Sequence, residues 1–355
     1  MIDKYYNGVV EQVYNHVGKI EKNIVMASYN NDFSIENLET VKRYRTQEDS
    51  VFFASREFGY RELAGAYDPF LETICDMFRK YGTDSFDAFM ESCGVYELHR
   101  EILRSYYENG RCERNENVLL NEVTYEQERM TAAMAAMLKA LAAKHPIVLV
   151  INRFQMASRS TFELVHELII HPDMNIGMVL GVNDTVGRWE SVAEVWDGIE
   201  ESLQDQSQLY HIGSSDRRRT ERTEEYSLGE GYTDNVDIDE DYDASIRKVA
   251  NIVEFLDYDQ AKRYFREVEN KMKFEDAKMN NASKCVFYLL YARTSILLGE
   301  LSKALELITE AGKMIPMGNE FRFRAQLDFL RGTCYMYQGK LDRAERYADR
   351  AYEHA

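Results

Sequence analysis

Five short apolar segments, rich in β-branched residues, place the strongest constraint on the fold of this chain. They are residues 23–28, 50–55, 147–151, 176–182 and 208–212. Continuous apolar runs of this length are typical of strands that are covered on both faces, as in a parallel sheet. Helical patterns occupy most of the stretches between them, at 34–45, 67–80, 84–108, 123–144 and 159–170. The alternation predicts a three-layer α/β domain over 1–212, with a five-stranded, mainly parallel sheet and a helical insertion at about 67–144.

A change of composition follows this domain. Residues 213–243 contain few large apolar side chains and many charges, which predicts a linker or a long loop. Its acidic end, DIDEDYD, spaces carboxylates somewhat like a calcium-binding loop. Tyr242 and Lys248 stand where that loop needs glycine and glutamate, so we interpret the segment as a solvated acidic linker.

The remaining residues, 244–355, show helical patterns, and their second half is repetitive. Two stretches, 299–316 and 339–355, share the spacing G-x-L-x-x-A followed by a further alanine seven residues later. The signature residues are Gly299, Leu301, Ala304, Ala311 and Pro316 in the first copy, and Gly339, Leu341, Ala344 and Ala351 in the second. A weaker copy, 257–268, has Ala261 in the small position. An unrelated helical bundle with chance alanines is the alternative interpretation.

The repeated pattern resembles the tetratricopeptide repeat (TPR), a helix–turn–helix unit whose small residues let paired helices pack closely. The resemblance implies an all-α, TPR-like solenoid whose groove binds a protein or peptide partner. The sequence stops at Ala355, inside the second helix of the last repeat. We therefore expect a fragment of a longer protein, or a second chain over the last repeat, which leaves homo-oligomerisation open.

Charge and cysteine content bound the partners and the compartment. The 43 basic and 61 acidic side chains leave a net charge of −18, which argues against nucleic acid and anionic membranes as partners. The five cysteines are scattered and odd in number, as expected for reduced thiols in the cytoplasm. The N-terminus lacks a signal-peptide pattern, and Lys139, Lys144 and His145 interrupt the most apolar region. The sequence thus predicts a cytoplasmic protein.

The third apolar segment and the residues after it, IVLVINRFQMAS at 147–158, carry a second resemblance. A strand of this kind, followed by a Phe-Gln-Met-Ala-Ser stretch and a helix, resembles the STAND group of AAA+-type ATPases in large bacterial regulators. The family resemblance implies acidic residues at the strand end, but this chain has Asn152 and Arg153 there. A polar residue facing the γ-phosphate is implied after the fourth strand, where Asn183 or Asp184 stands.

The same resemblance implies a phosphate loop, Gly-x-x-x-x-Gly-Lys-Ser/Thr, after the first strand. The aligned residues are SYNNDFSI, 28–35. Ser28 and Phe33 replace the glycines, Ser34 replaces the lysine and Ile35 replaces the hydroxyl residue. Asp32 adds a negative charge where a phosphate would lie. Loss of one catalytic group alone can reduce the rate about 10²–10³-fold, so we expect no ATP hydrolysis.

These observations predict a non-catalytic regulatory or scaffold protein of bacterial signalling, with a pseudo-ATPase domain, no cofactor and no metal. The alternative is a STAND switch that binds ATP or ADP in a non-standard site around Asn152, Arg153 and Asn183. A third interpretation, in which Arg153 merely forms a salt bridge to a neighbouring helix, competes with both hypotheses. A further acidic cluster, Glu57, Glu62 and Asp68 beside Arg56 and Arg61, is interpreted as charge pairing at helix ends.

Overall fold

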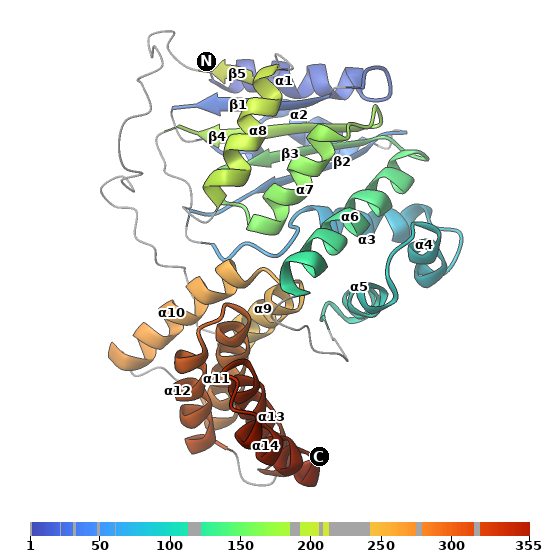
Figure 1. The fold of residues 1–355 in the computed structure, drawn as a ribbon. Coiled ribbons are helices and arrows are strands. Elements are labelled where there is room, and N and C mark those ends of the chain that lie inside the picture. Colours follow the sequence, from blue (N-terminus) through green and yellow to red (C-terminus); the bar gives the residue numbers. More distant parts are fainter. Residues whose placement is uncertain are drawn as a thin grey trace. The chain divides into compact units, whose positions relative to one another are not determined.

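Two compact units make up the computed structural model of the chain (Figure 1). The structure describes residues 2–21, 23–30, 33–47, 50–60, 62–112, 122–184, 192–205, 209–212, 242–274, 279–315 and 320–355. Unit 1 comprises Met1–Tyr107 and Glu128–Asp234, and unit 2 comprises Glu108–Gln127 and Asn235–Ala355. The predicted linker lies almost entirely outside the described residues.

Part of the predicted insertion, Glu108–Gln127, belongs to unit 2 and not to the α/β unit. Side-chain hydrogen bonds explain this assignment. The Asn251 amide accepts from the backbone N–H of Cys112 at 2.9 Å and donates to the carbonyl of Gly110 at 3.0 Å. Gln127 donates to the backbone carbonyl of Leu256 at 2.6 Å. These contacts join a segment of the insertion to the C-terminal helices.

A parallel sheet lies at the centre of unit 1. Its strands are β1 (Ile24–Tyr29), β2 (Phe52–Glu57), β3 (Ile147–Asn152), β4 (Ile176–Asn183) and β5 (Leu209–Ile212). They follow the order β2-β3-β4-β1-β5, and every pairing is parallel. The α/β class and the parallel sheet are confirmed. β1, β3 and β4 are buried along their whole length, as their continuous apolar runs predict.

The helices of unit 1 fall largely where the sequence pattern predicts them. They are α1 (Ile2–His16), η1 (Ile35–Asn37), α2 (Glu39–Thr46), α3 (Phe70–Tyr81), α4 (Phe86–Ser92), α5 (Glu97–Asn109), α6 (Val123–Ala142, which begins in unit 2), η3 (Phe154–Met156), α7 (Arg159–Ile170) and α8 (Ala193–Asp205). A single helix over 84–108 is wrong. Gly94 takes a φ of 73°, and its N–H bonds back to Glu91, so the first helix ends there and α5 begins afresh.

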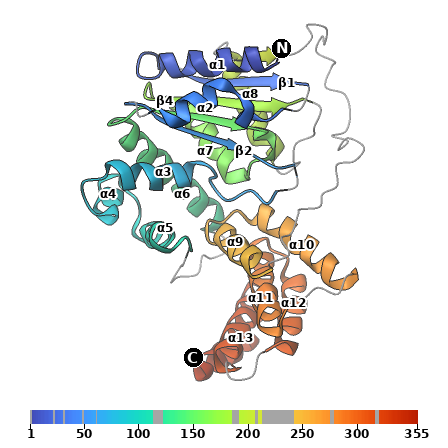
Figure 2. The same ribbon diagram turned by 180° about the vertical axis from the view of Figure 1, so that it is seen from behind.

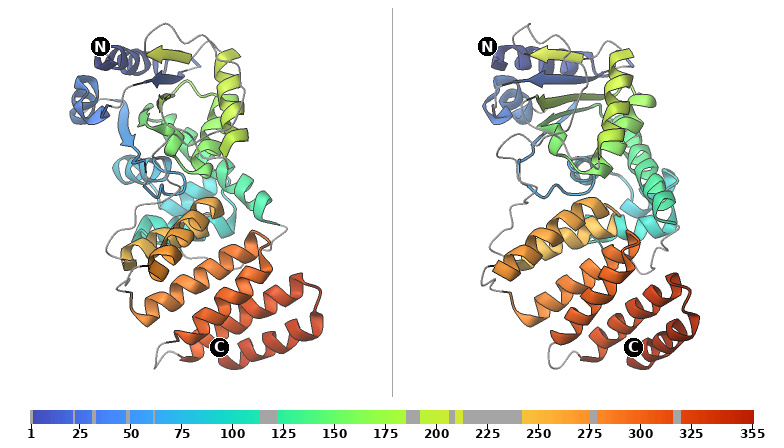
Figure 3. Two further views of the ribbon diagram at one scale, coloured as in Figure 1. Left: turned by 90° about the vertical axis from the view of Figure 1, so that its left-hand side faces the viewer. Right: turned by 60° about the vertical axis from the view of Figure 1, so that its left-hand side comes forward.

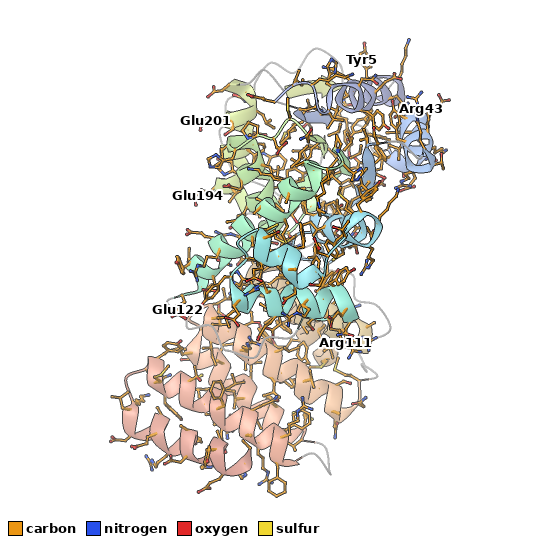
Figure 4. All side chains as sticks on the ribbon, turned by 90° about the vertical axis from the view of Figure 1, so that its right-hand side faces the viewer. Tyr5, Arg43, Arg111, Glu122, Glu194 and Glu201 are labelled. Carbon is orange, nitrogen blue, oxygen red and sulfur yellow. The ribbon has the colours of Figure 1, made fainter. Side chains whose placement is uncertain are left out.

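Helices cover both faces of the sheet. α1 and α2 lie on one face, and α7 and α8 lie on the other (Figures 1 and 2). In Figure 4, Tyr5 and Arg43 project from one side of the unit, and Glu194 and Glu201 of α8 project from the other. α1 was not predicted, yet its apolar positions pack into the core against β1, β3 and β4. These positions are Tyr6, Val9, Val10 and Val13.

The connections between strands diverge at the carboxyl edge of the sheet. From β1 the chain continues into α2 on one face, whereas from β4 it continues into α8 on the other (Figures 1 and 2). β1 and β4 are neighbours, paired from Ile24 with Met178 to Tyr29 with Asn183. In open α/β sheets, ligands bind outside the carboxyl ends of strands whose connections diverge in this way. A ligand site is therefore expected at the carboxyl ends of β1 and β4.

Unit 2 contains helices joined in antiparallel hairpins that pack on one another in sequence (Figure 3). The helices are α9 (Tyr242–Glu254), α10 (Tyr258–Phe274), α11 (Asn281–Leu297), α12 (Leu301–Lys313), α13 (Glu320–Tyr337) and α14 (Leu341–His354). α11 packs against its hairpin partner α12 and also contacts α9, α10 and α13. Each hairpin therefore contacts the next along the chain.

The same turn joins the helices of each hairpin. Gly299 and Gly339 take φ values of 77° and 71°, and Leu256 takes 67° at the matching place between α9 and α10. In every case the residue after the turn donates its N–H to a carbonyl five residues earlier. These bonds are Asp257 to Ile252 (3.1 Å), Glu300 to Ser295 (2.7 Å) and Lys340 to Tyr335 (2.9 Å). Three helix pairs are thus related by one local geometry.

Candidate functional site

Asn152 is the end of β3, at the place where the resemblance implies an acidic residue. Its side chain is fully buried. The Asn152 Oδ1 atom accepts a hydrogen bond from the Tyr29 hydroxyl at 2.7 Å, and its Nδ2 donates to the carbonyl of Phe33 at 3.2 Å. Both ends of the amide therefore have protein partners from the end of β1 and the loop that follows it. Asn152 therefore links Tyr29 and Phe33 to the end of β3.

Glu57 is the last residue of β2, and its carboxylate reaches the start of η1. Oε2 of Glu57 accepts from the backbone N–H of Ile35 at 2.8 Å and from the Ser34 hydroxyl at 3.0 Å. Ser34 is also the N-cap of η1, because its hydroxyl accepts from the N–H of Glu36. In a phosphate loop, backbone N–H groups at this place bind the nucleotide. Here a carboxylate of the chain itself occupies one of these donors.

Arg153 completes this network with its cation. It has a left-handed backbone, with a φ of 53°, which is costly for a residue with a side chain. Nη1 of Arg153 lies 3.1 Å from Oε1 of Glu57 and donates to the carbonyl of Phe58 at 3.1 Å. The guanidinium carbon is 4.5 Å from the centroid of the Tyr60 ring. Both charged side chains are about 15% exposed, so the pair is largely shielded from water.

A purely structural role for Arg153 predicts a salt bridge to a neighbouring helix. A salt bridge is present, but its partner is Glu57. Glu57 belongs to the end of the neighbouring strand and not to a helix. β2 and β3 are paired from Phe52 with Ile147 to Glu57 with Asn152, so these two strand ends lie side by side. The register of the sheet therefore brings Arg153 next to Glu57.

Asn183 ends β4 on the other side of the same edge. Its Nδ2 donates to the Tyr60 hydroxyl at 2.9 Å. Its backbone exchanges hydrogen bonds with the Gln155 amide, which donates to the Asn183 carbonyl at 3.2 Å and accepts from the Asn183 N–H at 3.4 Å. Asn152, Arg153 and Asn183 thus lie along one edge, and each bonds to protein groups there.

The described positions among those aligned with the phosphate loop do not have the arrangement of such a loop. Ser28 lies within β1, which continues to Tyr29. Phe33 packs its ring 4.7 Å from Tyr29 and 5.0 Å from Tyr6, measured between centroids. Ile35 is fully buried in the core beneath α1. The region is therefore filled by aromatic and aliphatic side chains; Asp32 lies outside the described residues.

A buried phenol lies beneath these residues. Burial, followed by the nearby Tyr29 and Glu57, raises the pKa of Tyr6 well above its ordinary value. Tyr6 therefore stays neutral over the physiological range. A Cβ added at Gly181 would collide with the Tyr6 hydroxyl and would lie 2.7 Å from Oδ1 of Asn152. Only glycine fits at this point of β4, because the side chains from both sides close over it.

Sequence reasoning missed four participants in this network: Tyr29, Glu57, Tyr60 and Gln155. The expectation of charge pairing at helix ends is wrong for Glu57. Arg56 pairs with Glu62 at 2.5 Å and with Asp68 at 2.9 Å, whereas Glu57 pairs with Arg153. One sequence signal separates Glu57 from this cluster. Arg56 and Glu57 are consecutive residues of a strand, so their side chains point to opposite faces of the sheet.

A second candidate surface is an apolar trough in unit 2. Two adjoining hollows of about 820 and 660 Å³ lie between α11, α13 and α14 and share Arg293, Phe329, Leu330 and Ala348. The signature residues Leu341, Ala344 and Ala351 line it. Ala304 and Ala311 are instead fully buried in the α11–α12 hairpin. Gly299 and Gly339 form turns, and Pro316 lies outside the described residues.

The described residues contain neither a metal-binding cluster nor a membrane-spanning helix. No group of three or more His, Cys, Asp or Glu side chains there is arranged to hold a metal ion. Within the same ranges, every helix is too short or too polar to cross a bilayer. No protein-family model matches the sequence, and a search of curated proteins finds no match.

Proposed function

We propose that this chain is a non-catalytic regulatory or scaffold protein of bacterial signalling. Its α/β unit would be a STAND-type pseudo-ATPase domain with a closed phosphate site. Its helical unit would consist of TPR-like repeats that bind a protein or peptide. The observation that carries the proposal is the Glu57 carboxylate, which accepts from the Ile35 N–H and pairs with Arg153 at the edge where a nucleotide would bind.

The chemistry at this edge opposes a nucleotide. A triphosphate needs backbone donors, a cation and a metal-binding carboxylate or hydroxyl. The Ile35 N–H and the Arg153 cation already have Glu57 as partner, and Ile35 supplies no hydroxyl. A phosphate that took these donors would have to displace Glu57 and leave its charge close by. Two like charges in a poorly hydrated place repel strongly, so binding is disfavoured.

The arrangement of strands supports the P-loop-like part of the proposal. β4 lies between β1 and β3, so the ends of the first, third and fourth strands converge. The resemblance implies functional groups at those three ends. The position of β5 beside β1 and the helices on both faces of the sheet support a three-layer, five-stranded domain.

The repeated turn supports the TPR-like part of the proposal. Ala261 and Ala304 occupy the same place after the turn in their hairpins, and both are fully buried. The matching Ala344 lines the trough. A large apolar trough in a helical array is the kind of surface that holds another polypeptide.

A cytoplasmic location completes the proposal. The cysteines form no disulfide in the described residues, and burial raises the pKa of Cys75 to about 12 and that of Cys285 to about 11. Such thiols stay protonated and unreactive near neutral pH.

Protein capture with matched variants tests the proposal. The tagged 355-residue chain is compared with Phe329→Asp in the trough, Arg153→Ala at the strand edge and Ser302→Glu on α12, away from the trough. We expect Phe329→Asp to lose a partner that the other two retain, and phosphate release from ATP to stay at background in all four proteins. Loss of the partner through Arg153→Ala alone, or hydrolysis above background, contradicts the proposal.

A nucleotide-responsive switch is the second candidate, and the backbone of Arg153 favours it. Strained residues cluster at functional sites, and Arg153 has a left-handed backbone at the edge where ligands bind. In this alternative a phosphate replaces Glu57 as the partner of Arg153. Nucleotide binding that is lost in Arg153→Ala would favour this candidate.

A further inference from the structure

The trough of unit 2 has a wall whose apolar side chains are uncovered. α14, all of whose residues the structure describes, has no buried residue, whereas α12 buries Ala304, Leu307, Ile308 and Ala311. Large apolar side chains of α13 and α14 are exposed along the trough. They are Phe329 (43%), Met336 (41%), Leu341 (66%) and Tyr352 (86%). This surface has the composition of an interface.

The face of α14 that lines the trough is narrow and has small residues at its centre. Its residues recur at the helical spacing: Leu341, Ala344, Ala348, Ala351 and Tyr352. Small side chains let a second helix approach closely, and the larger ones at each end supply contact area. α14 therefore is both a wall of the trough and a helix suited to lie in such a trough.

Charged side chains stand at opposite ends of the trough. Asp342 and Glu345 line the hollow beside the start of α14. Arg322 lines the other hollow, beside the end of α14, because α13 and α14 run antiparallel. Arg293 lines both, but it is paired with Glu254 at 2.5 Å. One end of the trough is thus acidic and the other end is basic.

We propose that a second copy of this chain occupies the trough, in a two-fold arrangement with the two α14 helices antiparallel. The residues common to both hollows, such as Phe329 and Ala348, would then lie near the two-fold axis. Arg322 of each copy would face Asp342 and Glu345 of its partner. This inference rests on the proposed function, in which the trough binds protein, and it identifies the partner.

Charge balance favours a self-docking α14 over other surfaces of the chain. The whole chain has a net charge of −18, so random contact between two copies is repulsive. Along the trough, however, the basic Arg322 of α13 lines one hollow, and the acidic Asp342 and Glu345 of α14 line the other, so the two signs can pair between two copies. A face that is its own complement under a two-fold rotation is what an isologous dimer requires.

Sedimentation velocity of the full chain tests the inference, from about 1 to 200 μM, a range that detects micromolar dissociation constants. We expect a concentration-dependent dimer. Ala348→Glu should raise the dissociation constant at least about tenfold, whereas Ser302→Glu, which adds the same charge on α12, should leave it unchanged. Circular dichroism confirms that each variant is folded. A monomer throughout, or a dimer indifferent to Ala348→Glu, overturns the inference.

A charge exchange at exposed residues tests the antiparallel arrangement. Arg322→Glu alone, and Asp342→Arg with Glu345→Arg, should each weaken the dimer. All three changes together should restore it, because opposite charges then face each other again. Failure of this restoration contradicts the proposed geometry. The chain could be monomeric and yet capture a different protein that the Phe329→Asp variant does not capture. This result would overturn the self-docking inference and leave the proposed function standing.

Discussion

The backbone N–H of Ile35 donates a hydrogen bond to the carboxylate of Glu57 at 2.8 Å. The two residues are 22 positions apart and meet at the carboxyl edge of the sheet. The other oxygen of the same carboxylate pairs with Arg153 at 3.1 Å. A backbone N–H donor and a cation are the two features that attract phosphate. The single carboxylate of Glu57 is therefore the partner of both.

Removing the Glu57 carboxylate should destabilise unit 1 and leave a site that a bound anion can fill. In Glu57→Ala, the Ile35 N–H and the Arg153 cation lose their partner, and we expect a loss of about 1–3 kcal/mol in the free energy of unfolding. Sulfate should then stabilise the variant more than the unaltered chain. At ten times its dissociation constant it would return about 1.4 kcal/mol.

Chemical denaturation with and without sulfate measures both effects. Glu11→Ala is the control, because it also removes a carboxylate paired with an arginine, Arg43 at 2.9 Å, but both of these side chains are about half exposed. Equal stabilisation of Glu57→Ala and Glu11→Ala by sulfate would show a general salt effect and would contradict an anion-like role for Glu57.

A methyl group at Gly181 should disturb the same edge from within. The added Cβ would lie 2.7 Å from Oδ1 of Asn152 and would collide with the buried Tyr6 hydroxyl. We expect Gly181→Ala to cost about 1–3 kcal/mol, as overpacking does. Gly8→Ala, in α1 with nothing within 4 Å, should instead be neutral or stabilising, because alanine favours a helix. Thermal unfolding that ranks the two variants in the opposite order would contradict this packing.

Leu256 should tolerate glycine better than alanine. Its φ of 67° strains any residue with a Cβ, and both substitutions lose the same buried leucine side chain. We expect Leu256→Gly to be more stable than Leu256→Ala by about 1 kcal/mol. The matched pair is Leu307→Gly and Leu307→Ala in α12, where alanine should be better by about 1 kcal/mol. The same order at both sites would show that position 256 does not adopt the turn of Gly299 and Gly339.

Unit 2 should lose stability in alkaline solution, partly through Tyr291. Burial first, and then Glu269, raise the pKa of Tyr291 from 10.0 to about 12. Between pH 10 and 12 the unfolded chain releases this proton while the folded chain keeps it. The stabilisation is present below pH 10 and is lost as the pH rises towards 12. Tyr291→Phe should therefore show a shallower fall in unfolding free energy over this range; parallel curves would contradict the assignment.

Local signals in the sequence predict the parts of the fold that depend on local physics. α7 spans Arg159–Ile170, the range predicted, because Ser158 caps the helix and the apolar spacing is regular. β3 and β4 are continuous apolar runs and were predicted within one residue. α1 is missing from the predicted helices, although Tyr6, Val9, Val10 and Val13 recur at helical spacing and form one buried face. The turn at Leu256 was also hidden, because it lacks the glycine found at 299 and 339.

The candidate site was only half predictable, because its partners come from separate strands. Asn152, Arg153 and Asn183 were visible as polar residues after apolar runs. Glu57 was not, since its pairing with Arg153 follows from the register of β2 against β3, which no local pattern contains. The losses in the phosphate loop predict an inactive site. The position of the Glu57 carboxylate at this site becomes visible only in the three-dimensional structure.

Calorimetric titration of the purified chain with ATP and with ADP, each with and without Mg²⁺, tests the central claim most directly. We predict no heat of binding up to about millimolar nucleotide, where an interaction is worth only about 4 kcal/mol. Binding at micromolar concentration would contradict a closed site. Its dependence on Mg²⁺ would then distinguish a retained metal site from a phosphate that has replaced Glu57 beside Arg153.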